Sequence, residues 1–169
     1  MHNQQWYPVH EPEPMTDCLL CRGEEGDPEL SRVEVWRDDL WRLSMSRRAS
    51  TLGFAYLEPI RHIPYLADLD GPEAATFGPA IAKASAALRQ ASGARLVYAY
   101  LFGGGIPHLH VHLAPNIPEG VLNTNLINGE VEEHKLPSGA SEIISKDYPD
   151  LPEEELETVI ERARELMAR

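Results

Sequence analysis

Basic residues and long apolar runs are scarce in this sequence of 169 residues. No apolar run approaches the roughly 20 residues that a membrane-spanning helix needs, so no membrane span is predicted. The 15 Lys and Arg residues stand against 27 Asp and Glu residues, which gives a formal net charge of −12. Because each phosphate contact needs a cation, an acidic chain with no basic stripe is a poor candidate for binding nucleic acid or an anionic membrane. A small phosphorylated ligand needs only a local cluster of donors and is not excluded.

Cysteine is scarce as well. The chain has two, Cys18 and Cys21, in a C-x-x-C spacing. The segment from Met1 to Gln5 has no basic region followed by an apolar one, so no secretory signal is expected and the protein is predicted to be cytoplasmic. In that compartment a C-x-x-C pair indicates a redox pair or half of a metal site rather than a structural disulfide.

The rest of the composition, 43% hydrophobic and 25% charged, is typical of one folded globular domain. Alternation of apolar and polar residues predicts short strands at 33–36, 41–45, 53–57, 96–102 and 109–114. A helix is expected to start near Pro72 with Asp70 close to its N-cap, and Pro79 predicts a kink or a later start. Residues 116–144 are interpreted mainly as loop, and 152–169 as an amphipathic helix.

The most informative segment runs from Gly103 to Ala114 and reads GGGIPHLHVHLA. In it, His108, His110 and His112 alternate with apolar residues. On a strand this spacing places all three imidazoles on one face. A polar strand face that happens to use histidine is the alternative. Because residues i and i+4 of a strand lie about 13 Å apart, one metal ion cannot bind all three histidines, which leaves at least one imidazole free for chemistry.

The sequence HLHVHLA at 108–114 resembles the signature of the histidine triad (HIT) superfamily, in which three histidines alternate with apolar residues. The segments VWRDDLW at 35–41 and GFAYLEPIRH at 53–62 are similar to the first hairpin and the P-x-R-H segment of that superfamily. The resemblance covers residues 17–116. It implies an α+β fold, with an antiparallel five-stranded meander sheet, one long helix packed on it and an additional C-terminal helix.

The resemblance also suggests how the chain is organised. We expect an irregular arm at 1–16, a HIT domain at 17–116 and a C-terminal extension at 117–169, which is either part of the same domain or appended to it. The extension is acidic, because residues from Pro115 onward include 13 acidic and 5 basic side chains, a net charge of −8. A homodimer is expected from the resemblance alone.

By the same resemblance, the protein is an enzyme that acts on the phosphorus of a nucleotide or nucleotide conjugate. His110 would be the nucleophile and would form a covalent nucleotidyl-histidine, which water then discharges. His112 and the backbone N–H groups of Gly103, Gly104 and Gly105 would bind the phosphate, although an ordinary turn is the alternative for the glycines. A transferase that hands the nucleotide to a sugar phosphate or an amine is a second interpretation, and a nucleotide-binding scaffold protein with weak turnover is a third.

Some HIT branches hold a zinc ion with a C-x-x-C pair, the histidine of the P-x-R-H segment and the first histidine of the triad. These branches include the galactose-1-phosphate uridylyltransferases and certain bacterial hydrolases. The matching residues here are Cys18, Cys21, His62 and His108. The resemblance therefore implies a structural zinc ion in a closed Cys₂His₂ set. Two free thiols and an ordinary core histidine are the alternative.

Two positions depart from the superfamily pattern. Ile106 and Pro107 stand where many family hydrolases place a Gln or Ser that contacts the phosphate or the leaving group. Ser44 and Ser46 stand where an Asp or Asn often holds the ribose hydroxyls, so they are candidate nucleoside-binding residues with a shorter reach. Both departures remove side chains that family hydrolases use to bind substrate, so they favour the interpretation as a scaffold protein with weak turnover.

Overall fold

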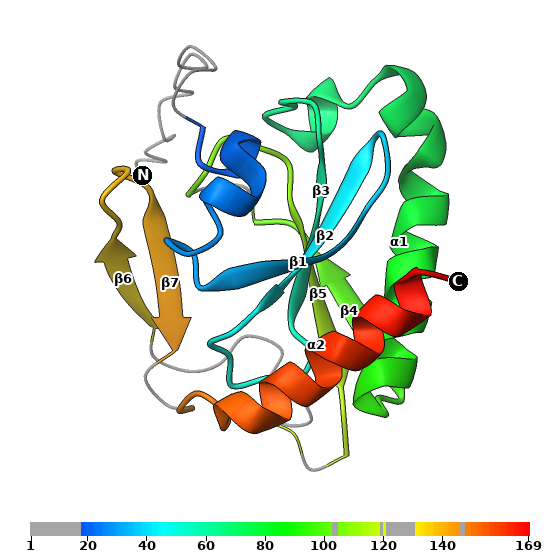
Figure 1. Cartoon of the computed structure of the whole chain (residues 1–169). Helices are drawn as coiled ribbons and strands as arrows, with labels where there is room; N and C mark the ends of the chain where they lie inside the picture. Colours follow the sequence, from blue (N-terminus) through cyan, green and yellow to red (C-terminus); the bar gives the residue numbers. More distant parts are fainter. Residues whose placement is uncertain (1–17, 103–104, 119, 121–130, 146–147) are drawn as a thin grey trace, which may run out of the picture.

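The computed structural model of the protein describes residues 18–102, 105–118, 120, 131–145 and 148–169 (Figure 1). None of the helices in these segments combines the length and the hydrophobicity that a membrane span requires.

Five antiparallel strands form the central sheet, in the order β1-β2-β3-β5-β4. The strands are β1 (Arg32–Arg37), β2 (Trp41–Ser46), β3 (Ala55–Pro59), β4 (Leu96–Tyr100) and β5 (Val111–Asn116). The predicted α+β class and the five-stranded antiparallel sheet are confirmed, but the strand order is not that of a simple meander. Because β3 and β4 both pair antiparallel with β5, they run parallel to each other and need a crossover connection. A long helix, α1, provides that connection.

Helix α1 (Gly71–Ser92) follows Asp70, which is its N-cap residue, so the expected start near Pro72 is confirmed. The helix continues through Pro79, so the expected later start is wrong. Its first turns are held by tertiary packing, because Phe77 lies against Trp41 with the ring centroids 5.6 Å apart. The buried face of α1 consists mainly of small and apolar side chains: Ala80, Ala84, Ala87, Leu88 and Ala91.

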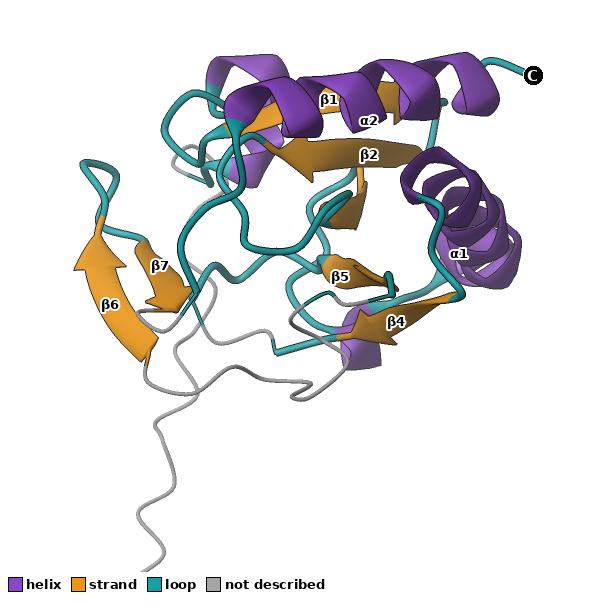
Figure 2. Ribbon diagram, turned by 90° about the horizontal axis from the view of Figure 1, so that it is seen from below, coloured by secondary structure: helices purple, strands orange, loops and turns teal. Residues whose placement is uncertain are grey.

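Helix α2 (Glu153–Met167) confirms the predicted C-terminal helix. It runs along β1 and meets α1 at the same face of the sheet (Figures 1 and 2). The face that it buries is the one that the helical spacing predicts: Leu156, Val159, Ile160, Ala163 and Met167. A single core therefore contains side chains of the sheet and of both helices.

The two faces of the sheet differ in character because successive side chains of a strand alternate between them. One face packs against the helices and supplies the largest core side chains, among them Trp41, Leu43, Met45, Leu57, Val111 and Leu113. The opposite face carries polar and charged side chains, among them Arg42, Ser44, Tyr56, Glu58 and His112. The candidate site lies on this polar face.

A second, two-stranded sheet consists of β6 (Val131–Lys135) and β7 (Ser141–Ser145) and lies beside the short 3₁₀ helix η2 (Leu20–Glu25) (Figure 1). The interpretation of residues 116–144 mainly as loop is wrong for this hairpin. The sequence did not predict its strands because they lack the apolar alternation that marks a half-buried strand. A second apolar cluster joins the hairpin to η2 and to the loop before the histidines: Leu19, Leu20, Leu30 and Ile106, with Leu136 and Ala140 packed against them.

The packing of α2 generates a test of the fold. Ile160 is fully buried, so Ile160→Ala should lower the free energy of unfolding by about 2–5 kcal/mol, measured by urea denaturation. The control is Arg162→Ala, on the exposed face of the same helix, which should change stability by no more than about 0.5 kcal/mol. Equal stability of the two variants would mean that α2 does not belong to the core.

Candidate active site and metal centre

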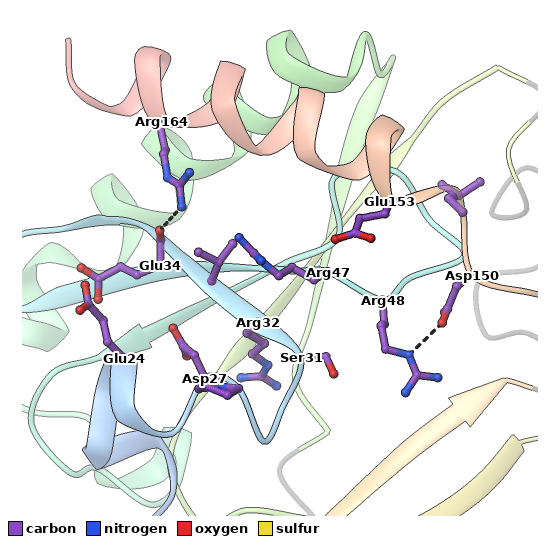
Figure 3. A pocket seen from close by; sticks show the side chains of 13 residues that line it. Glu24, Asp27, Ser31, Arg32, Glu34, Arg47, Arg48, Asp150, Glu153 and Arg164 are labelled. Carbon is purple, nitrogen blue, oxygen red and sulfur yellow. Dashed lines mark hydrogen bonds and ion pairs between the residues drawn. The ribbon is translucent and has the colours of Figure 1, made fainter.

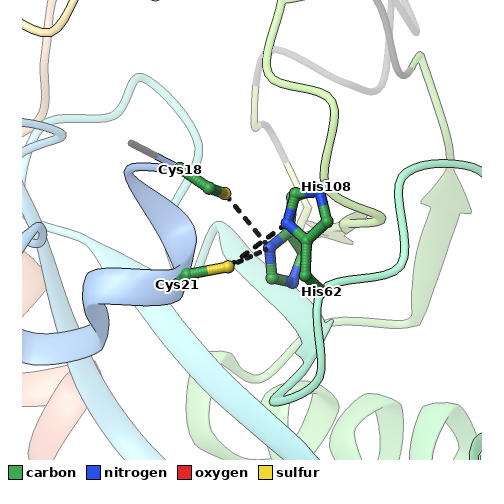
Figure 4. Close-up of side chains that lie close together, drawn as sticks. All are labelled: Cys18, Cys21, His62 and His108. Carbon is green, nitrogen blue, oxygen red and sulfur yellow. Dashed lines mark hydrogen bonds between the residues drawn. The ribbon is translucent and has the colours of Figure 1, made fainter. Parts of the chain in front are cut away.

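The two cysteines and two of the histidines lie close together although they are far apart in the sequence. Cys18 and Cys21 belong to the turn and helix at η2, His62 follows β3, and His108 precedes β5. Their ligand atoms all lie within 4.8 Å of one another. Figure 4 shows both thiols turned toward the two imidazoles. The four residues that the resemblance grouped are thus together in space.

The geometry of this cluster fits a tetrahedral zinc ion. The Sγ of Cys21 lies 3.2 Å from Nδ1 of His62 and 3.5 Å from Nδ1 of His108, and the Sγ of Cys18 lies 3.4 Å from Nδ1 of His108. Zinc bonds of about 2.3 Å to sulfur and 2.0–2.1 Å to nitrogen place the corners of such a site about 3.5 Å apart. The other ring nitrogen of His108, Nε2, donates to the Pro59 carbonyl at 2.9 Å, which leaves Nδ1 to face the metal position.

The two thiols differ in their tendency to ionise. Burial opposes ionisation of Cys18, but its contacts with His108 and Cys21 together outweigh burial and lower the pKa of this thiol. Burial raises the pKa of Cys21 to about 12, and the neighbouring Cys18 adds to the rise. One thiolate therefore disfavours a second beside it, and a bound dication would remove that conflict by stabilising both.

The triad histidines do not all lie on a strand. The strand predicted over 109–114 begins only at Val111, so His112 is on β5 while His108 and His110 precede it. The pairing of β5 with β3 ends at Val111 and Leu57, and the next backbone contact is a single bond from Leu109 N to the Ile63 carbonyl, at 2.6 Å. The rings of His110 and His112 lie beside each other, with centroids 5.1 Å apart, whereas His108 turns to the thiols.

His110 is held in one tautomer by the backbone. Its Nδ1 lies 2.6 Å from the carbonyl oxygen of His108. A carbonyl can only accept, so Nδ1 carries the proton and Nε2 keeps its lone pair. Burial lowers the pKa of His110 to about 4, against the effect of this hydrogen bond and helped by the charge of Arg32, so the imidazole is neutral near pH 7. A neutral imidazole with a free Nε2 can act as a nucleophile toward phosphorus.

His112 lies among aromatic rings on the polar face. Tyr56 and Tyr100 are its partners in the neighbouring strands, with ring centroids 5.2 and 5.3 Å from that of His112. Phe54 and Phe102 also contact it, at 5.9 and 5.4 Å. Burial lowers the pKa of His112 to about 3, and the neighbouring His110 adds to the shift. His112 is therefore neutral as well, and its ring lies beside that of His110.

The remaining predicted site residues are the three glycines and the two serines. Gly103 and Gly104 lie outside the described residues, and Gly105 is exposed. Ser44 is fully buried beside Tyr56, its partner on β3. Ser46 is also buried, and its hydroxyl donates to the Arg48 carbonyl at 2.6 Å. The nucleoside contact expected of both serines stays a prediction.

A network of largely buried charges on the polar face was missed by the sequence analysis. Arg42 donates to Asp27, to Glu34 at 2.7 Å and to Glu58 at 2.8 Å. Arg32 extends the network, since its Nη1 lies 3.6 Å from the other oxygen of Glu58. The signal was present in the sequence, because these residues alternate with apolar ones along β1, β2 and β3.

A groove of about 850 Å³ runs along the outer edge of β1 (Figure 3). Its walls come from β1, the turn after η2, the loop after β2 and the start of α2. Neither His110 nor His112 lines it. The groove and the histidines are linked by Arg32, which lines the groove and stacks on Tyr56.

Comparisons with known proteins found matches by structure but none by sequence. No protein-family model matches the chain, and no curated protein matches it. Among solved structures, a hypothetical histidine triad nucleotide-binding protein from Sulfolobus tokodaii is 18% identical, with a TM-score of 0.62, and covers 89% of this chain and 92% of its own. A histidine triad protein from Bradyrhizobium japonicum is 16% identical with a TM-score of 0.64, and covers 83% and 93%.

A third structural neighbour is a zinc-bound histidine triad family protein from Mycobacterium smegmatis. It is 16% identical, has a TM-score of 0.60, and covers 89% of this chain and 93% of its own. The structural neighbours of this chain are thus histidine triad proteins, one of them with bound zinc, and the chain has their fold.

Proposed function

We propose that this protein is an enzyme that cleaves a nucleoside phosphate bond through a covalent nucleotidyl-histidine at His110. The observation that carries the proposal is the contact between Nδ1 of His110 and the His108 carbonyl, which leaves Nε2 as the free nitrogen. The histidine triad fold and the nucleotide-binding description of one structural neighbour support it.

In the first step, Nε2 of His110 attacks the phosphorus, the N–P bond forms, and the bond between phosphorus and the leaving group breaks. In the second step, water attacks the same phosphorus and the N–P bond breaks, which releases the nucleotide and restores the imidazole. His112 lies beside His110 and would donate to the phosphate oxygens as charge builds up on them. A sugar phosphate or an amine in place of water would make the enzyme a transferase with the same intermediate.

We also propose that Cys18, Cys21, His62 and His108 hold a structural zinc ion. The donor spacings fit zinc, and four protein ligands complete a tetrahedral shell with no position left for substrate. The ion would tie η2 to the segment before β5 and so hold the carbonyl that orients His110.

The expected homodimer also belongs to this proposal. Strand β4 is an outer strand of the sheet, and an unpaired edge can pair with a second chain. Large apolar side chains are exposed on and after this strand, since Leu96 is 44% exposed, Leu101 40% and Phe102 59%. We propose that these side chains lie in the contact between two copies.

The nucleophile can be tested with a panel of adenosine and guanosine phosphoramidates, dinucleotides and nucleotide sugars. His110→Ala should lower turnover by several orders of magnitude and abolish the nucleotidyl adduct seen by intact mass, because a covalent route needs the nucleophile. His112→Ala should lower turnover by about 10²–10³-fold, since it removes one donor. His134→Ala, at an exposed position of the hairpin, is the control. Turnover that survives in His110→Ala would rule out the nucleotidyl-histidine.

The metal can be tested by elemental analysis of the purified protein. We expect about one zinc per chain, because the four donors form a complete shell. His62→Ala should lose the zinc and lower the melting temperature, since metal binding and folding are linked, whereas His134→Ala should keep both. A wild-type protein without metal, in which both thiols react freely while it is folded, would contradict the proposal.

The dimer can be tested by light scattering coupled to gel filtration. The wild-type protein should have the mass of two chains, and Leu96→Glu should have the mass of one, because it places a charge in an apolar contact. Leu66→Glu is a matched control, since Leu66 is 49% exposed but lies in the short helix η3 (Leu66–Asp68), away from β4. A monomeric wild-type protein, or equal effects of both substitutions, would exclude this interface.

A further inference from the structure

Arg32 brings a positive charge close to the histidines. It lies on β1, is only 9% exposed, and its guanidinium carbon is 3.3 Å from the ring centroid of Tyr56 on β3. The side chain therefore crosses the polar face above β2. The ring of Tyr56 in turn contacts His112. A single aromatic ring separates this cation from the candidate phosphate-binding histidine.

The hydrogen bonding of Arg32 is incomplete. Among the described residues its Nη1 has no hydrogen-bond partner although the atom is buried. The Oε2 of Glu58 is 3.6 Å away, which is too long for a hydrogen bond, and this oxygen also has no hydrogen-bond partner in the described segments. The Oγ of Ser44, beside Tyr56, is a third buried polar atom with no partner within the described part of the chain. Buried polar atoms are normally paired, and a phosphate oxygen could accept from both the arginine and the serine, so their gathering at one place indicates a polar ligand.

The other buried arginine on this face shows what a purely structural role looks like. Arg42 is 3% exposed and meets three carboxylates, those of Asp27, Glu34 and Glu58. Its guanidinium is fully engaged by the protein. Arg32, in contrast, is held in position by the face of Tyr56 and shares Glu58 with Arg42. Stacking fixes the plane of a guanidinium while leaving its N–H edge available to an anion.

We propose that Arg32 binds a second phosphate group of the substrate, next to the phosphate that meets His110 and His112. The inference rests on the proposed function and narrows it to substrates in which a nucleotide is joined to another phosphate, as in dinucleoside polyphosphates and nucleotide sugars. An arginine fork matches the oxygens of a phosphate in a bidentate manner, which a lone lysine cannot do. Nucleotide conjugates with an uncharged leaving group lack the group that Arg32 would bind.

The test compares two substrates in each variant: a dinucleoside diphosphate and a nucleoside phosphoramidate of an uncharged amine. The readout is the ratio of their kcat/KM values, which a general loss of folded protein does not change. The wild-type enzyme should prefer the dinucleotide. Arg32→Met should reduce the ratio by about 10- to 100-fold, which is the effect expected when a charge-assisted hydrogen bond is lost. Arg32→Lys should give an intermediate ratio.

Arg47→Met is the matched control. Arg47 lines the same groove, but its side chain is 46% exposed and pairs with Glu157 at 3.3 Å, so the ratio should stay at the wild-type value. If Arg32→Met lowered the melting temperature but left the ratio unchanged, Arg32 would only balance the charge of Glu58, and the inference would be wrong. A wild-type ratio that shows no preference for the dinucleotide would overturn it as well.

A binding measurement separates this inference from the proposed function. If neither substrate is turned over and no adduct forms, the proposed function fails, and inorganic pyrophosphate then serves as the probe. Pyrophosphate should raise the melting temperature of the wild-type protein and of Arg47→Met but not that of Arg32→Met. Equal shifts in all three proteins, or no shift in any of them, would refute binding of a second phosphate by Arg32.

Discussion

The placement of His108 is the constraint on which the rest of the site depends. Its imidazole faces the thiols through Nδ1 and donates to the Pro59 carbonyl through Nε2, and its own carbonyl holds Nδ1 of His110. The side chain is 1% exposed, so these contacts fix a residue that cannot turn away into solvent. Any displacement of the Cys18–Cys21 segment is therefore transmitted through one residue to the candidate nucleophile.

The two faces of the sheet are stabilised by different interactions. The apolar face is stabilised by burial of side chains against α1 and α2, which is favourable at almost any detailed geometry that excludes water. The polar face is stabilised by Arg42 and its carboxylates, where desolvation of the charges is offset only if each partner is in place. The histidines, rings and ion pairs of the polar face need precise positions. The packed apolar face holds the strands that provide those positions.

The sequence was sufficient for the parts of the fold that depend on local periodicity. Alternation located the strands of the sheet, and the spacing of Leu156, Val159 and Ile160 located the buried face of α2. The Cys₂His₂ grouping came from the family signature, because spacing alone cannot bring Cys18 and His108 together across most of the domain. Strand order could not be read from the sequence, because it depends on which edge of the sheet β4 joins after helix α1.

Other parts depend on contacts that no local pattern encodes. The tautomer of His110 is set by a carbonyl two residues away, and it becomes visible only when the backbone before β5 is known. The stacking of Arg32 on Tyr56 joins β1 to β3 across the strand between them. The β6–β7 hairpin was missed because few of its residues are apolar and its turn docks through few side chains, such as Leu136, onto another segment.

The second apolar cluster divides the molecule into regions of unequal cooperativity. It is much smaller than the main core and joins η2, the hairpin and the loop at Ile106 without help from α1 or α2. Regions with few buried apolar contacts open at lower free energy than the global transition, as separate foldons. Amide hydrogens of the hairpin should therefore exchange through local opening while those of β2 and β3 still report global unfolding. The hairpin would then open and close as one unit beside a rigid sheet.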